Sequence, residues 1–307
     1  MLLAASCTAA TAIPTQPPSV TISRLADDAA GVRPVADLEL LAAYHLRSPD
    51  PRFGGFSAIE TDGRTLWLLS DRAFLWHAAM TIDGRSGDLA LEGWTVGALL
   101  GDAADRRSLD SEALALGPHG TLLAAFEHDD SVRCLVPEAS GDWSTVRLHD
   151  GRLIGDAPAN QGLESLARLP DGSLLALSEG ARVAPDIAAG ARLGDGGIER
   201  FGYRVAPDFS PVGAAATSDH LYVLERAVGV LTGWRSRLVR TRLPAPPLAG
   251  ILEGEELLRI NAGPLAENYE GVAILERPGE DALILLVADD NQSPLQRTLL
   301  LVFTYAG

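Results

Sequence analysis

Short apolar runs alternate with tight polar turns along most of this chain. One unit recurs: an apolar strand, a turn built on Asp-Gly, His-Gly or Gly-Glu-Asp, and a second apolar strand ending in an acidic residue. The clearest copies span 112–127 (EALALGPHGTLLAAFE) and 164–179 (ESLARLPDGSLLALSE), which align without gaps. Each unit has the pattern of a β-hairpin, and no helical period competes with it.

Three further copies follow the same plan. They are 57–71 (SAIETDGRTLWLLSD), 270–289 (EGVAILERPGEDALILLVAD) and a degenerate copy ending at Glu225 (VGAAATSDHLYVLE). Hairpins that recur about every 50 residues, with outer-strand segments between them, are typical of propeller blades. The sequence therefore predicts an all-β chain with a single β-propeller of six blades. Five blades is the alternative, because one blade has to be assembled from the weakly patterned 230–265 stretch and the strand around Glu39.

The length of 307 residues fits one closed all-β unit, so we expect residues 21–307 to form a single domain. Residues 1–20 differ from the rest. They contain a short apolar stretch, small residues ending at Cys7 and a Thr/Pro-rich spacer, and they resemble the signal of a bacterial lipoprotein. We therefore expect an exported protein, periplasmic or anchored to the membrane through Cys7. An unstructured N-terminus is the alternative.

The formal net charge is −16, and every basic residue is arginine. Such a field repels nucleic acids and phosphate esters at a distance, so we expect no nucleic-acid partner. An anionic substrate would need a cation or a local arginine cluster to approach. We expect a monomer that acts on a small molecule.

Acidic residues stand at both ends of most hairpin units. In an antiparallel hairpin, the first residue of strand one and the last residue of strand two lie at the same end, opposite the turn. The pairs placed in this way are Glu112 with Glu127, Glu164 with Glu179, Glu270 with Asp289, and Ser57 with Asp71. If these hairpins are the inner strands of the blades, the carboxylates converge on the mouth of the central channel. There they must protonate, pair with arginine or bind a cation.

Oxygen ligands in this number favour calcium over zinc, for which a histidine or cysteine cluster would be expected. Asn268, Asn160 and Asn291 offer amide oxygens nearby. The candidate metal ligands are Glu112, Glu164, Glu270, Asp71, Glu127, Glu179, Asp289 and Asn268. The alternative is that the acids pair with arginines and only seal the blade ends; these arginines are Arg72, Arg226 and Arg297.

Four residues are candidates for catalysis. Glu164 and Glu112 would act through the ion that they hold. Arg72, like Arg226, directly follows a strand-terminal acid; both could position an anionic substrate, with a salt bridge to a neighbouring blade as the alternative. His128, beside Glu127, could carry a proton, with an ordinary surface position as the alternative. Ser57 could be a nucleophile, but no His and Asp can be assigned to it from spacing.

Four motif groups occur in a fixed order along the chain: GGFSAI…LWLLSDR, DSEALAL…GTLLAAFE, NQGLESLARLPDGSLLALSE and NYEGVAIL…VADDNQSPLQRTLLLVF. Together they resemble the bacterial phytase-like family ("esterase-like activity of phytase") over roughly residues 36 to 305. The resemblance implies an exported propeller grouped with the phytases. By analogy with propeller phytases, calcium would let a phosphomonoester approach and would activate a water molecule. The rim is also similar to that of gluconolactonase-like propellers, at the level of architecture.

Two functions follow from the sequence. The first is a calcium-dependent hydrolase of phosphate or carboxylic esters that works outside the cytoplasm. The second is a non-catalytic surface propeller that binds a ligand or a protein, with the ion locking the blades together.

Overall fold

The structure, a computed structural model, describes residues 17–25, 29–35, 37–100, 110–128, 130–149, 153–154, 162–243, 248 and 250–306. Apart from a short 3-10 helix at Pro118–Gly120, the regular elements of these residues are β-strands. Within this described part, no helix is long and apolar enough to cross a membrane. Cys7 lies outside the described residues, so the lipoprotein signal stays a prediction.

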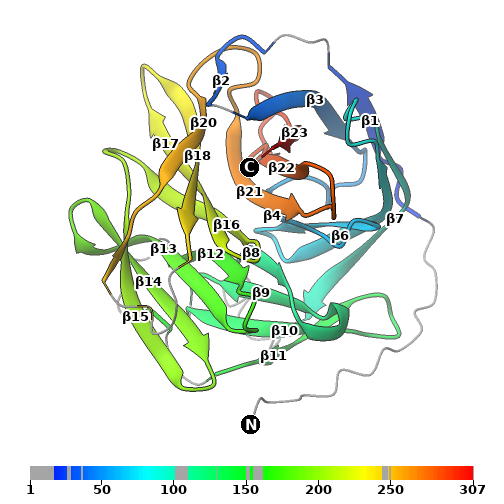
Figure 1. Cartoon of the computed structure of the whole chain (residues 1–307). Helices are drawn as coiled ribbons and strands as arrows, with labels where there is room; N and C mark the ends of the chain where they lie inside the picture. Colours follow the sequence, from blue (N-terminus) through cyan, green and yellow to red (C-terminus); the bar gives the residue numbers. More distant parts are fainter. Residues whose placement is uncertain are drawn as a thin grey trace.

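The strands form five antiparallel units, or blades, each running outward from a first strand near the centre (Figure 1). Blade 1 is β4 (Phe56–Thr61), β5 (Thr65–Ser70), β6 (Phe74–Ile82) and β7 (Leu89–Leu100), and blade 2 is β8 (Ser111–Leu116), β9 (Leu122–Phe126), β10 (Ser131–Pro137) and β11 (Trp143–Arg147). A parallel pair between β7 and β11 joins these two blades into one eight-stranded sheet.

The other three blades each carry a fifth, edge strand. Blade 3 is β12 (Leu163–Arg168), β13 (Leu174–Ala184), β14 (Ile187–Gly194), β15 (Gly197–Arg204) and the edge strand β19 (Ile251–Leu252). Blade 4 is β16 (Ser210–Ala216), β17 (His220–Gly229), β18 (Gly233–Arg242), β20 (Glu255–Ile260) and the edge strand β2 (Val32–Pro34). Blade 5 is β21 (Asn268–Leu275), β22 (Ala282–Asp289), β23 (Leu299–Tyr305), β3 (Leu38–Arg47) and the edge strand β1 (Thr21–Arg24).

The first strands of the blades close a ring around the centre. β4 contacts β8, β8 contacts β12, β12 contacts β16, β16 contacts β21, and β21 returns to β4. The ring is tight: a Cβ at Gly213 would lie 2.4 Å from the carbonyl oxygen of Glu270, and one at Gly271 would lie 2.8 Å from the backbone nitrogen of Ile59. The predicted all-β propeller is therefore confirmed.

The described strands make five blades, not the six expected. The 230–265 stretch supplies β18 and β20 to blade 4 and β19 to blade 3, while the strand around Glu39 becomes β3 of blade 5. Five hydrophobic clusters fill the five interfaces between neighbouring blades. The apolar pattern of this stretch is weak because its strands mix buried and partly exposed positions. The pattern therefore does not indicate to which blade each strand belongs.

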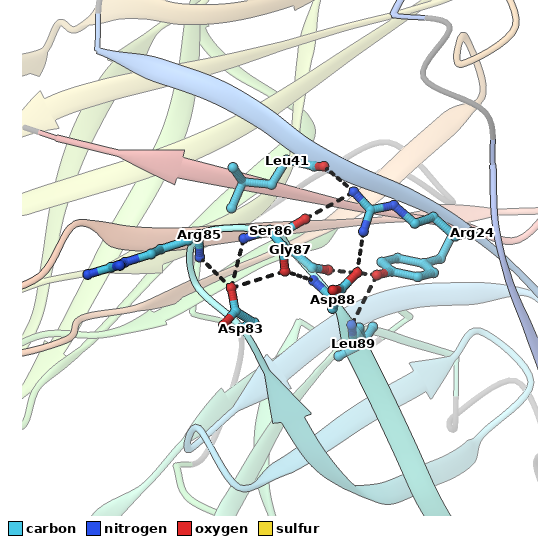
Figure 2. Close-up of polar contacts among 9 residues, drawn as sticks. Arg24, Leu41, Asp83, Arg85, Ser86, Gly87, Asp88 and Leu89 are labelled. Carbon is cyan, nitrogen blue, oxygen red and sulfur yellow. Dashed lines mark hydrogen bonds and ion pairs between the residues drawn. The ribbon is translucent and has the colours of Figure 1, made fainter.

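The N-terminal strand β3 pairs with the C-terminal strand β23 and so closes blade 5. Figure 2 shows how β3 and β1 also hold the turn between β6 and β7 of blade 1. The Tyr44 hydroxyl donates to the Gly87 carbonyl at 2.6 Å and accepts from the Leu89 backbone N–H at 3.0 Å. Arg24 donates to the Ser86 carbonyl at 3.0 Å and pairs with Asp88. These contacts tie the last blade to the first.

Replacing Tyr44 with Phe removes a hydroxyl that pairs with two backbone groups at once. Because these groups would lose their partner in a mostly buried position, we expect the free energy of unfolding to fall by about 1–2 kcal/mol. Urea unfolding measures this change. Glu39→Gln, at an exposed position of the same strand, is the control and should leave stability unchanged. An unchanged urea midpoint for Tyr44→Phe would show that the hydroxyl does not hold the turn.

Candidate metal centre

Every first strand carries a β-bulge at the same place, near its start. In each blade the pairing with the second strand skips one residue. The skipped residues are Ser57, Glu112, Glu164, Val212 and Glu270. A bulge leaves its extra residue out of the ladder and redirects the side chain. Ser57 and the three glutamates line one small cavity on the channel axis, of about 10 Å³, room for about one water molecule or ion.

A second set of side chains comes from the second strands, at the same end of the blades. The backbone N–H groups of Asp71, Glu127 and Glu179 each donate, at 3.0 Å, to the carbonyl of the residue two places before the bulged one. Arg226 and Asp289 occupy the same position, opposite Ser210 and Asn268. The structure thus brings the predicted carboxylates together at one end of the channel, which we call the mouth.

Blade 4 departs from the predicted repeat. The sequence alignment ended the fourth hairpin at Glu225, but β17 continues, and Arg226 takes the place that an acid takes in the other blades. Glu225 is fully buried between blades 3 and 4, where the Tyr203 hydroxyl of blade 3 donates to it at 2.7 Å. The bulged residue of this blade is Val212 instead of glutamate. The mouth therefore holds seven carboxylates and one guanidinium in these positions.

Arg226 bridges blades 3 and 5 across blade 4. Its guanidinium donates to Glu179 Oε1 at 2.8 Å, to Asn268 Oδ1 at 3.1 Å, and to Glu270. The ring of Trp234 lies 5.6 Å from its central carbon. On this side of the mouth the acids pair with an arginine, as the alternative to metal binding in the sequence analysis predicts.

The other two arginines of that alternative do not pair with mouth acids. Arg297 pairs with Glu267 at 2.7 Å, outside the mouth positions. Arg72 is exposed and donates to the carbonyls of Pro51 and Phe53, at 3.1 and 3.3 Å.

The blade 2 side of the mouth holds carboxylates that can share a cation. Asp110, Glu112 and Glu127 each offer an oxygen atom, and these atoms all lie within 4.8 Å of one another. Sequence reasoning missed Asp110, although it stands two residues before Glu112, as Asn268 stands before Glu270. A polar residue two places before the bulged glutamate is the sequence feature that could have identified Asp110 as a candidate ligand.

Burial and mutual repulsion raise the pKa values of the bulged glutamates. The pKa of Glu112 lies well above its ordinary value because the group is buried and because Glu164 and Glu270 are close. Burial, followed by the charge of Glu179, raises the pKa of Glu164, and Arg226 opposes this shift. Burial also raises the pKa of Glu270, again against Arg226.

The pKa values of three acids on or just after the second strands are raised as well. Burial and then Glu270 raise the pKa of Asp289 to about 8. Burial raises the pKa of Glu127 to about 7, and partial burial raises that of Asp71 to about 6 although the residue as a whole is exposed. Without a cation, several of these carboxyl groups hold protons near neutral pH. A divalent cation could take the place of those protons.

The remaining predicted residues have other surroundings. Asn268 accepts from Arg226 and donates to Glu270 Oε1 at 2.8 Å, so its amide is engaged on the arginine side. The Asn291 amide donates to Gln296 at 2.7 Å, and Asn160 lies outside the described residues. His128 is exposed beside Glu127. The Ser57 hydroxyl donates to the Ser111 carbonyl at 2.7 Å and so bridges blades 1 and 2.

Replacing Arg226 with Gln should destabilise the protein more at pH 8 than at pH 5. At pH 8 the variant leaves the buried Glu270 carboxylate without its counter-charge, for a loss of about 3 kcal/mol in the free energy of unfolding. At pH 5 Glu270, whose pKa is raised by burial, can protonate instead. Urea unfolding at both pH values tests this, with Arg204→Gln as the control; Arg204 pairs with exposed Asp186 and Glu253, so we expect a loss of less than about 1 kcal/mol. Equal losses of stability at the two pH values would show that Arg226 does not act as the counter-charge of the mouth acids.

The raised pKa values also fix how stability depends on pH. In the window between the ordinary pKa of Asp289, 3.8, and its folded value of about 8, the folded protein binds more protons than the unfolded chain. The contribution of Asp289 to stability is therefore fully present below pH 3.8 and is lost as pH rises through about 8. We expect the Tm of cation-free protein to fall as pH rises toward 8, and an added divalent cation to raise it most at pH 8. A larger effect of the cation at pH 5 would be the opposite result.

The comparisons with known proteins concern the family and the fold. The sequence profile of the phytase-like family, described as "Esterase-like activity of phytase", matches residues 51–292. No curated protein matches this chain. Among solved structures, similar folds include PQQ-bound aldose sugar dehydrogenase from Streptomyces coelicolor, at 15% identity, covering 94% of this chain and 100% of that chain, with a TM-score of 0.43.

Two further solved structures have similar folds. Periplasmic gluconolactonase from Pseudomonas aeruginosa is 15% identical, covering 85% of this chain and 81% of that chain, with a TM-score of 0.38. Virginiamycin B lyase from Staphylococcus aureus is 10% identical, covering 93% and 99%, with a TM-score of 0.41. Similarity this low carries no argument about activity. The family profile, in contrast, spans more than half of the sequence, and the chain belongs to the phytase-like family.

Proposed function

We propose that this protein is a hydrolase of phosphate or carboxylic esters that depends on a divalent cation, calcium, at the channel mouth. One observation carries the proposal. The mouth has two unlike sides, a carboxylate group in blade 2 (Asp110, Glu112 and Glu127) and a guanidinium at Arg226 that reaches from blade 3 to blade 5. A cation and an arginine at one mouth suit an anionic or carbonyl substrate group.

The donor set of blade 2 fits a hard cation. All three side chains offer oxygen, and no histidine or cysteine belongs to the group. Calcium prefers oxygen ligands, whereas zinc sites are usually built with nitrogen or sulfur. Glu164, from the neighbouring blade, raises the pKa of Glu112 by its charge, so it is close enough to matter electrostatically. It is the next candidate ligand or proton acceptor.

The residues of the mouth divide the work of the proposed reaction. Bound there, a divalent cation would polarise the ester and lower the pKa of a water molecule. Glu164 lines the same cavity as Glu112 and, in its ionised form, can accept a proton. Arg226 can donate two hydrogen bonds to an anionic group when that group replaces Glu179 or Glu270. Arg226 thereby takes the positioning role proposed from the sequence for both arginines, whereas the Arg72 guanidinium already donates to two carbonyls.

His128 remains a candidate for proton transfer at the rim, since it is exposed beside Glu127. Location and assembly stay proposals too. The sequence of residues 1–20 supports export, with Cys7 as a lipid anchor. We also propose that the protein is a monomer and acts on a small molecule.

Replacing Glu112 with Gln tests the proposal directly. The substitution keeps the shape of the side chain but removes a charged ligand, so we expect calcium binding to be lost and kcat/KM to fall by at least about 100-fold. Titration calorimetry with calcium and hydrolysis of p-nitrophenyl phosphate and p-nitrophenyl acetate measure the two effects. Glu60→Gln is the matched control, because Glu60, like Glu112, is a partly exposed residue on a first strand and has a raised pKa, of about 7, but stands at the other end of β4.

Three results would separate the alternatives. Calcium binding without turnover of either ester would favour the non-catalytic propeller. Turnover that survives chelation would contradict the dependence on a cation. Loss of calcium in Glu60→Gln as well as in Glu112→Gln would show that the two substitutions act through the fold.

A further inference from the structure

Three connections at the mouth end of the blades carry strongly exposed apolar side chains. In the described part of the chain, five large apolar residues are more than half exposed, with fractions from 64% for Val228 to 105% for Val230. The five are Val183, Val228, Val230, Leu231 and Leu295. Scattered exposed apolar residues need no explanation, but a group on one face beside a site points to a ligand or partner.

All five residues lie in connections that begin at the mouth. The second strands of blades 3, 4 and 5 reach the mouth at Glu179, Arg226 and Asp289. Beyond these positions, Val183 lies in the β13–β14 hairpin, Leu295 lies in the loop after β22, and the other three residues lie in the β17–β18 hairpin. β13 continues five residues beyond Glu179, to Ala184. The corresponding connections of blades 1 and 2 are short, at 71–73 and 127–130. The apolar residues therefore stand on the side of blades 3, 4 and 5, and we call them the apolar wall.

The part of the apolar wall in the β17–β18 hairpin adjoins Arg226 at the mouth. Val228 pairs with Trp234 across the β17–β18 hairpin, and the Trp234 ring lies 5.6 Å from the Arg226 guanidinium carbon. Val230 and Leu231 form the tip of that hairpin. A chain of contacts thus leads from the group that would hold an anionic or ester head, along Trp234 and Val228, to the exposed tip.

We propose that the apolar wall binds the hydrocarbon part of the substrate, so that the substrate is an amphiphilic ester with one apolar chain. This inference rests on the proposed function for the identity of the head group. The charge of the protein favours a single molecule taken from solution. The formal net charge of −16 would repel the anionic surface of a bilayer.

The test is the dependence of kcat/KM on chain length. With calcium present and below micelle-forming concentrations, p-nitrophenyl esters from acetate to decanoate should be hydrolysed with kcat/KM rising about two- to fourfold per methylene group. In the double variant Val230→Ser/Leu231→Ser this rise should be largely lost. The control is Ile198→Ser, an exposed apolar residue at the opposite end of blade 3, which should keep the wild-type rise.

A binding measurement separates this inference from the proposed function. Decylphosphonate and methylphosphonate are titrated against wild-type and variant protein, with the fluorescence of Trp234 and calorimetry as readouts. Tighter binding of decylphosphonate by wild type, lost in the double variant, supports the apolar wall even if no ester is hydrolysed. Equal binding of the two phosphonates overturns it even if esters are hydrolysed. Binding of wild type to phosphatidylcholine vesicles, lost in the variant and without any chain-length dependence, overturns it in favour of bilayer docking.

Discussion

The repulsion among carboxylates gathered on the channel axis is the interaction on which the arrangement of the mouth depends. Five first strands close a tight ring. Glycine is needed at Gly213, where blade 4 meets blade 5, and at Gly271, where blade 5 meets blade 1. The bulge in each strand then directs one side chain to the axis. Three of these are glutamates, and burial alone would raise their pKa values. Because the three glutamates lie together, protons, an arginine or a cation must compensate their negative charges.

The chain uses an arginine on one side of the mouth only. Val212 removes one carboxylate from the axis and Arg226 replaces a second-strand acid with a guanidinium, both in blade 4. Arg226 pairs with acids of the two flanking blades and so links three of the five blades. In blade 2, Asp110, Glu112 and Glu127 face one another, with Asp110 and Glu127 each adding to the raised pKa of Glu112. This division gives the mouth two different kinds of binding group, which a uniform ring of acids would lack.

The same hairpins that build the mouth also extend beyond it. Since the second strands run toward the mouth, any lengthening of their connection to the third strand adds material directly above the acids. Blades 3 and 4 are lengthened in this way, and the added residues include Val183, Val230 and Leu231. A propeller can therefore change what it binds by the length of these connections, while the ring and its bulges stay as they are.

The sequence by itself determined the hairpins, the all-β propeller and the end of the blades at which the acids gather, because alternation of strands and turns and antiparallel geometry are local properties. It could not determine the number of blades, since strands such as β18 and β20 mix buried and partly exposed positions and carry a weak pattern. It also could not show that Arg226 replaces Glu225 at the mouth, because the bulge in β16 shifts the pairing by one residue. Asp110 joined the carboxylate group only once the fold placed it beside Glu127. These features depend on contacts between residues far apart in the chain, and only the tertiary structure decides them.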